Sequence, residues 1–150
     1  MKIIDQKLNL DITDTLTHRR FPFTLDEPFD KLVIHLAYNP RQVPAEIGTD
    51  LAIACVDRDL PAGVFDEATR ADVKTSTIEN FITVSLLHEG NFVGDYHNKN
   101  NNQEIIVSKE KSSLGYKKLE ILPGSYELVL SMHSCNCPVE VDLSLEAINE

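Results

Sequence analysis

The sharpest chemical cluster in the sequence is a histidine and two cysteines at alternate positions, His133, Cys135 and Cys137. Alternate residues of a strand face the same way, so these three soft ligands could converge on a metal ion such as zinc. The spacing differs from the Cys-x-x-Cys pair of a zinc knuckle, and the remaining cysteine, Cys55, is far away in the sequence. We therefore predict a strand end with partly buried thiols, no bound metal and no cofactor.

A second cluster lies around a glycine turn, where His88 precedes Gly90, and Asp95, Tyr96 and His97 follow it. An aspartate and a histidine on one face of a strand can act as an acid–base pair or as ligands, and His88 could lie across the hairpin. The sequence contains neither a Gly-x-Ser-x-Gly nucleophile motif nor a glycine-rich phosphate loop. We predict that these residues form a ligand or partner surface, or simply a polar outer face, and that the protein is not an enzyme.

Aromatic side chains bear on sugar binding, because sugars stack on exposed rings. The sequence has no tryptophan. The candidates for exposed rings are Phe29, Tyr38, Phe65, Phe92 and Tyr96. This composition weakens a carbohydrate-binding interpretation but keeps it open.

The charge of the chain excludes some classes of partner. The formal net charge is −10, and the negative charge is spread along the sequence. Binding to phosphate backbones or anionic lipids needs clustered Lys and Arg, so we expect neither nucleic acid nor membrane as a partner. No apolar leader or membrane-length apolar run is visible, and the cysteines read as reduced thiols, so we expect a cytoplasmic protein.

The elements that must position these clusters are mostly strands. Apolar and polar residues alternate with a period of two in many short segments separated by turn residues. The predicted strands are 8–12, 21–25, 32–38, 81–88, 91–97, 103–109, 116–121, 125–134 and 138–148. Pro22 makes the second an edge strand or a bulged one. About nine strands predict one domain over residues 1–150, an all-β, jelly-roll-like antiparallel sandwich.

A change of period interrupts the strands after Pro44. Ile47, Leu51 and Ala54 follow helical spacing, which predicts a helix over about residues 44–59. Residues 64–79 are charged, and we predict a surface loop there with one helical turn at 66–71. The narrow apolar stripe of the helix is expected to lie across a sheet face or to cap the open end of the sandwich.

The run at residues 80–94, followed by His97, by residues 113–116 and by residues 121–126, resembles a known pattern. It is similar to the N-terminal β-sandwich that precedes a PHP-type metal-dependent phosphoesterase domain in some bacterial metallohydrolases. This chain departs from the pattern at Val93, Leu114 and Tyr126, and it lacks the His-x-His metal motif of the phosphoesterase. The resemblance therefore implies a sandwich with an accessory role.

The function that these observations favour is a non-catalytic binding or interaction module, bacterial in style and accessory to a separate metal-dependent phosphoesterase. The first alternative is a sandwich that binds a carbohydrate or another small ligand, and the second is a metal-dependent hydrolase. The partner is expected to be a protein or a small ligand. We expect the binding surface beside the helical insertion, near Asp95 and His97, because long non-repetitive insertions in compact domains are often functional.

Overall fold

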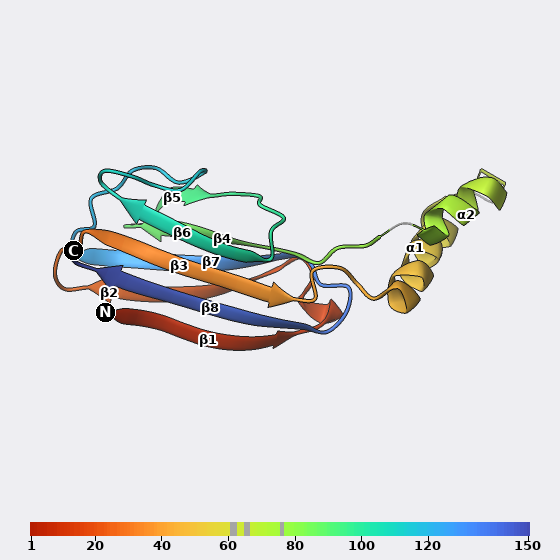
Figure 1. Ribbon diagram of the computed structural model, residues 1–150, viewed down its shortest axis with the longest axis horizontal. Coiled ribbons are helices and arrows are strands. Elements are labelled where there is room, and N and C mark those ends of the chain that lie inside the picture. The colour runs from red at the N-terminus through yellow and green to blue at the C-terminus, as the bar shows by residue number, and fades with distance from the viewer. Residues whose placement is uncertain (61–62, 65–66, 76) are drawn as a thin grey trace.

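The structure, a computed structural model, describes residues 1–60, 63–64, 67–75 and 77–150. Two four-stranded antiparallel sheets lie face to face (Figure 1). The first sheet contains, in order, β1 (Lys2–Leu10), β8 (Val139–Ile148), β3 (Lys31–Asn39) and β6 (Asn102–Ser108). The second contains, in order, β2 (Thr17–Leu25), β7 (Gly124–Ser134), β4 (Phe81–His88) and β5 (Asn91–Asp95). The predicted all-β sandwich is confirmed.

The strand pairing follows one simple rule. β1 pairs with β8, β2 with β7, β3 with β6 and β4 with β5, so the chain forms one long hairpin that is rolled into two layers. This is the arrangement of an eight-stranded jelly roll. The described residues hold eight strands where the sequence predicted about nine. As expected for a strand that contains Pro22, β2 lies at a sheet edge.

The core forms where the inner faces of the two sheets meet. On β8, alternate residues are buried and each is at most 1% exposed: Val139, Val141, Leu143, Leu145 and Ala147. On β7, Leu128 and Leu130 are completely buried. The period of two in the sequence therefore predicts the register of these two strands correctly.

Residues 116–121, predicted as a strand, belong instead to the long connection between β6 and β7. The connection touches β5 through an isolated bridge between Tyr116 and Gly94. It touches β6 through Ser113, whose Oγ accepts a hydrogen bond from the Ile106 amide at 2.9 Å. Because its backbone hydrogen bonds go in turn to β6 and to β5, the connection forms no regular ladder with either strand. The connection nevertheless covers the edges of both strands, which would otherwise be open.

Two other predicted strand ends are displaced. Ile12 does not continue the first strand but lies in a short 3-10 turn, Ile12–Asp14, whose first amides are capped by the Asp11 carboxylate. β5 ends at Asp95, so His97 lies just beyond the strand. At the first of these places the Asp11 side chain competes with the ladder for a backbone hydrogen bond.

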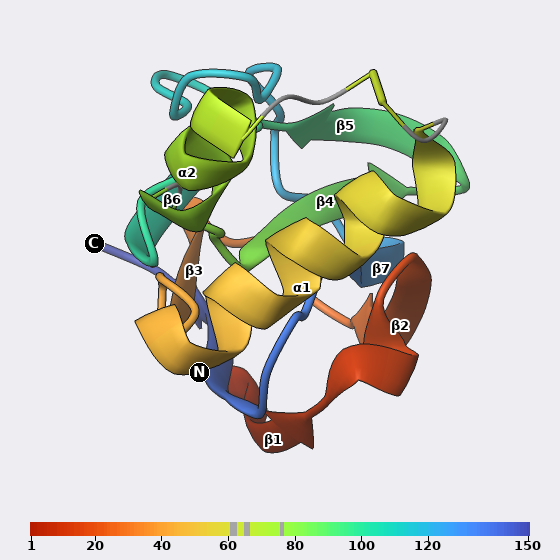
Figure 2. The same ribbon diagram turned by 90° about the vertical axis from the view of Figure 1, so that its right-hand side faces the viewer.

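The insertion between β3 and β4 contains two helices, α1 (Ala45–Asp59) and α2 (Glu67–Thr75). The first confirms the predicted helix. The second replaces the single turn expected at 66–71, of which residue 66 lies outside the described residues. The two helices pack against each other and project from one end of the sandwich (Figures 1 and 2). We call residues 45–75 the helical arm.

The predicted packing of the insertion onto the sandwich is wrong. Neither helix packs extensively against a strand. Ile47 is 41% exposed and Ala54 is exposed, so the expected apolar stripe is not covered. Apolar residues lie around α1 rather than along one face. The helical spacing in the sequence therefore predicts the helix correctly but does not predict what the helix packs against. Neither helix is long and apolar enough to cross a membrane, within the residues described.

A small hydrogen-bond network fixes the base of the arm. The amide of Asn80 donates to the Arg41 carbonyl at 2.8 Å, and its side-chain Nδ2 donates to the Pro40 carbonyl at 2.9 Å. Its Oδ1 accepts from the Asn136 amide at 2.8 Å. Asn80 is only 2% exposed. A single buried side chain therefore joins both stems of the arm to the turn between β7 and β8.

Candidate functional site

The outer face of the second sheet carries hydrogen-bonded polar side chains. In the register, His18 of β2 lies opposite Ser131 of β7, which lies opposite Thr83 of β4. A hydrogen bond of 2.9 Å joins His18 Nδ1 to Ser131 Oγ, and one of 2.8 Å joins His133 Nε2 to Thr83 Oγ1. Thr83 and Ser131 are 2% and 8% exposed. These hydroxyls are thus held in fixed positions and anchor the two imidazole rings.

A third histidine approaches the same place from the end of β5. The ring of His97 lies 5.1 Å from the ring of His133, and both contact Phe81, with ring centroids 5.7 and 4.8 Å apart. Asp95 Oδ2 lies 3.8 Å from His97 Nε2. We call His18, Phe81, Asp95, His97 and His133 the histidine surface. Phe81 is the first residue of β4, so this surface adjoins the base of the helical arm.

The electrostatics of the histidine surface favour neutral imidazole at its centre. Partial burial lowers the pKa of His133 below its ordinary value, and the neighbouring His97 and His18 lower it further, while Asp95 opposes them. A neutral imidazole offers one donor and one acceptor. The surface can therefore form directional hydrogen bonds and ring contacts with a partner at neutral pH.

Two of the four residues predicted to form the binding surface do lie together. Asp95 and His97 are joined as expected, but His88 lies near the β4–β5 turn, at the far end of the hairpin from both. Its ring stacks on Tyr126 at 4.3 Å, so it has a packing role. Tyr96 lines a hollow whose lining does not include His97. Neighbours along a chain near a strand end point in different directions, which the sequence pattern could not resolve.

Sequence reasoning missed Phe81 and His18, and it assigned His133 to the wrong cluster. All three lie on the outward-facing positions of adjacent strands. Only the pairing of β2, β7 and β4 identifies them, because the side chains beside a residue on the outer face of a sheet belong to the neighbouring strands. Sequence spacing within one strand carries no such information.

The His133, Cys135 and Cys137 cluster does not converge. β7 ends at Ser134, so the alternation of the strand stops before the cysteines. Cys135 is completely buried, and burial, aided by Asp14 and Cys137, raises the pKa of its thiol to about 11. Cys137 Sγ accepts from Asn80 Nδ2 at 3.3 Å. The described residues contain no group of three histidine, cysteine or acidic side chains placed to hold a metal ion.

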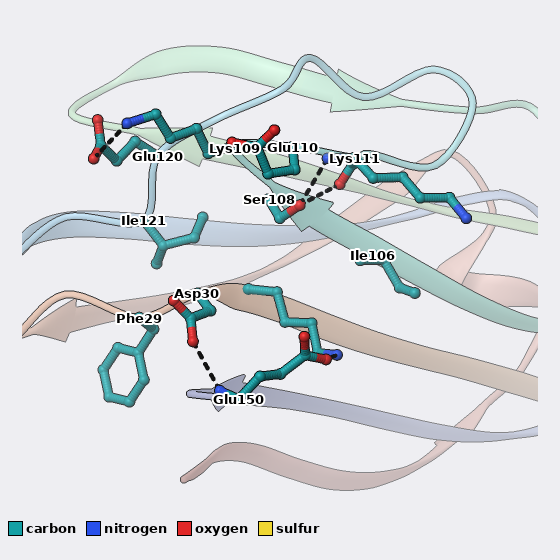
Figure 3. A pocket seen from close by; sticks show the side chains of 11 residues that line it. Phe29, Asp30, Ile106, Ser108, Lys109, Glu110, Lys111, Glu120, Ile121 and Glu150 are labelled. Carbon is teal, nitrogen blue, oxygen red and sulfur yellow. Dashed lines mark hydrogen bonds and ion pairs between the residues drawn. The ribbon is translucent and has the colours of Figure 1, made fainter.

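A hollow of about 490 Å³ lies where β3, β6 and β8 meet the connection before β7 (Figure 3). Its apolar lining residues are Phe29, Ile106 and Ile121. Lys109 pairs with Glu120 at 3.1 Å, and Lys31 pairs with Glu150. These charges neutralise each other at the rim, and all four side chains are at least 25% exposed. The hollow is therefore a solvated groove with paired charges.

A smaller hollow of about 280 Å³ lies beside Tyr96. It is lined by the amide side chains Asn98, Asn100, Asn102 and Gln103. Of the rings expected at the surface, Tyr96 is 44% exposed and Phe92 is 51% exposed, whereas Tyr38 is buried in the core. Phe29 is half-buried, and Phe65 lies outside the described residues. An exposed ring next to several amides is an arrangement that suits polar, hydroxylated ligands.

A scan of the sequence against models of protein families finds no match, and a search of curated proteins finds no significant match.

Proposed function

We propose that the protein is a non-catalytic interaction module and that its partner contacts the helical arm together with the adjoining histidine surface. The observation that carries this proposal is the position of the arm. It projects from the end of the sandwich instead of packing on it (Figure 1). A helical element that contributes little to the packing of its own domain is available to contact another molecule.

The side chains of the arm fit this role. Ile47 is 41% exposed, Leu60 just after α1 is 37% exposed, and Val64 is 59% exposed. Ile47 lies near the start of α1, Leu60 at its end and Val64 beyond it, so a partner that lies along the arm could cover these apolar side chains. Asn80 holds the base of the arm in place, so the arm is presented in a defined direction.

The histidine surface supports binding rather than catalysis. It lies on the outer face of a sheet, whereas catalytic groups generally converge in a concave pocket. The hydroxyls that bond to its imidazole rings belong to Thr83 and Ser131, which are almost fully buried, so they are poorly placed to attack a substrate.

The resemblance of the sandwich to domains that precede PHP-type phosphoesterases supports a metal-dependent phosphoesterase as the protein partner. In such an arrangement the arm and the histidine surface would contact the catalytic protein. The module itself would hold no metal.

Replacing exposed apolar residues of the arm with charged ones tests the proposal. We expect the Ile47→Glu and Leu60→Glu variants to lose the partner in quantitative affinity capture, since each places a charge in an apolar contact. Leu122→Glu is the matched control, because Leu122 is 44% exposed and precedes β7 at the end of the sandwich remote from the arm. A reciprocal titration with the purified partner gives the affinities. Equal capture by all three variants would contradict the proposal.

A second candidate function, recognition of a carbohydrate, rests on the hollow beside Tyr96. Gln103 Nε2 donates to the Asn98 and Asn100 carbonyls, and Asn98 Oδ1 accepts from the Asn100 amide at 2.9 Å, so the loop is held in one conformation. Titration against a panel of oligosaccharides tests this function. Binding that Tyr96→Ala abolishes and Tyr96→Phe retains would support it, and no binding to any sugar would exclude it.

A further inference from the structure

The edge strands on the two sides of the sandwich differ in whether another segment covers them. On one side, the connection between β6 and β7 covers the edges of β5 and β6. On the other side, β1 and β2 are edge strands, and in the described part of the chain no strand pairs with the outer edge of β1. From Ile4 to Leu10, β1 pairs with β8 without a register shift. A regular edge strand of this kind presents a row of backbone donors and acceptors to a further strand.

The residues of β1 are complementary to their own sequence in the antiparallel direction. When two copies are centred on Gln6, Asp5 lies opposite Lys7 of the second copy, and Lys7 lies opposite its Asp5. Ile4 then lies opposite Leu8, and Gln6 faces Gln6. Both Asp5–Lys7 pairs are therefore attractive, and the apolar side chains of Ile4 and Leu8 lie opposite each other.

Neighbouring registers lack this complementarity. Moving the centre to Asp5 places the two Asp5 carboxylates opposite each other, and moving it to Lys7 does the same for the two ammonium groups. Centring the pair between Gln6 and Lys7 places Leu8 opposite Asp5, and centring it between Asp5 and Gln6 places Ile4 opposite Lys7, so in each case an apolar residue faces a charged one. One register is thus favoured over its neighbours.

The side chains are also on the correct faces for this pairing. Ile4 is 7% exposed and Leu8 is partly buried, and both pack toward the core. Lys7 already lies 3.5 Å from Asp142, but the two side chains are 88% and 66% exposed, so this ion pair is weak and can be exchanged. Pairing residues of equal parity keeps outward-pointing backbone groups opposite each other.

We propose that two copies of the chain associate through β1, antiparallel and centred on Gln6, so that their first sheets join into one continuous sheet. This association is independent of the proposed partner contact, because the arm lies at the end of the sandwich and β1 lies along its side (Figure 1). The interface is isologous and closes as a twofold dimer.

Sedimentation equilibrium of the full chain over a range of protein concentrations tests the proposal. We expect a monomer–dimer equilibrium, with the dissociation constant raised about tenfold or more by Asp5→Lys or Lys7→Asp, because each change creates two like-charged pairs. The double variant Asp5→Lys with Lys7→Asp restores attraction and should recover the dimer. A monomer at every concentration, or a dimer that the single reversals do not weaken, would overturn the proposal.

A disulfide trap reports the register itself. Directly opposite residues have Cα atoms about 4.5–5.5 Å apart, within the range of a disulfide. In a Cys55→Ser background, Gln6→Cys should form a covalent dimer on mild oxidation. Lys7→Cys is the control, since its two copies would be separated by about 8 Å. Equal cross-linking of the two variants would refute this register, and failure of Gln6→Cys to cross-link would do the same.

Discussion

Leu128 and Leu130 show at the residue scale how the sequence pattern fixes the core. Both are completely buried on β7. We expect Leu128→Ala or Leu130→Ala to lower the free energy of unfolding by about 2–5 kcal/mol, because each change removes buried methyl groups and leaves a cavity. Urea denaturation followed by circular dichroism measures the loss. Leu122→Ala, at a 44% exposed position, is the control. Midpoints of the two core variants that match wild type would show that the register is wrong.

His133 makes stability depend on pH. Its pKa in the folded protein is lower than the ordinary value of about 6.5, first because of burial and then because of His97 and His18. The unfolded chain therefore binds a proton more readily than the folded one. It follows that stability is lost as the pH falls through the unfolded pKa and that no further loss occurs below the folded pKa.

Thermal unfolding at a series of pH values between about 7.5 and 5 measures this dependence. We expect the His133→Gln variant to have a flatter stability curve over that range than wild type, because its side chain does not titrate. His35→Gln is the control, since His35 is an exposed histidine on the outer face of the other sheet. An unchanged slope in His133→Gln would contradict the assignment.

At the scale of elements, the most informative residue is Asn80, which ties the arm to the sandwich. Replacing it with Ala removes the partners of the Pro40 carbonyl and the Asn136 amide. Each polar group left unsatisfied on burial costs about 1–3 kcal/mol, so we expect Asn80→Ala to be destabilised by about 2 kcal/mol or more. Asn91→Ala, at the exposed first position of β5, is the control. Urea unfolding of both variants decides the matter, and equal stabilities would argue against this network.

The elements were predictable where one physical signal dominates. Strands β4, β7 and β8 and helix α1 were found because burial on a single face, or a change of period after Pro44, leaves a clear pattern. The stretch 116–121 was assigned to a strand from its side-chain pattern, yet it makes an isolated bridge at Tyr116 and single backbone bonds to β5 and β6 in place of a ladder. Alternation reports which side chains are buried and does not report backbone pairing.

The candidate site was predictable only in part, because it is assembled across strands. Asp95 and His97 are close in sequence and stay close in the structure. Phe81 and His133 are joined by the pairing of β4 with β7, which brings together residues far apart in the chain. A single sequence contains the residue types but not the strand order, so the histidine surface could not be derived from it.

At the scale of the whole molecule, the protein combines a jelly-roll sandwich with a projecting arm. The core of the sandwich lies between its two sheets and includes none of the arm residues that the structure describes. The stems of the arm pair with each other, since the Val43 amide donates to the Ile78 carbonyl at 2.8 Å. The arm is therefore attached through its own short ribbon, and we expect its removal to leave the two sheets intact.

The central claim is that the arm serves recognition and not the stability of the sandwich. The most direct test is a variant in which a short Gly/Ser linker replaces residues 45–75. The quantity to measure is its free energy of unfolding. The structure predicts a value within about 1 kcal/mol of wild type, because surface loops tolerate changes in length at small entropic cost. A loss of several kcal/mol, or a failure of the shortened chain to fold, would show that the arm is a structural part of the sandwich and would contradict the claim.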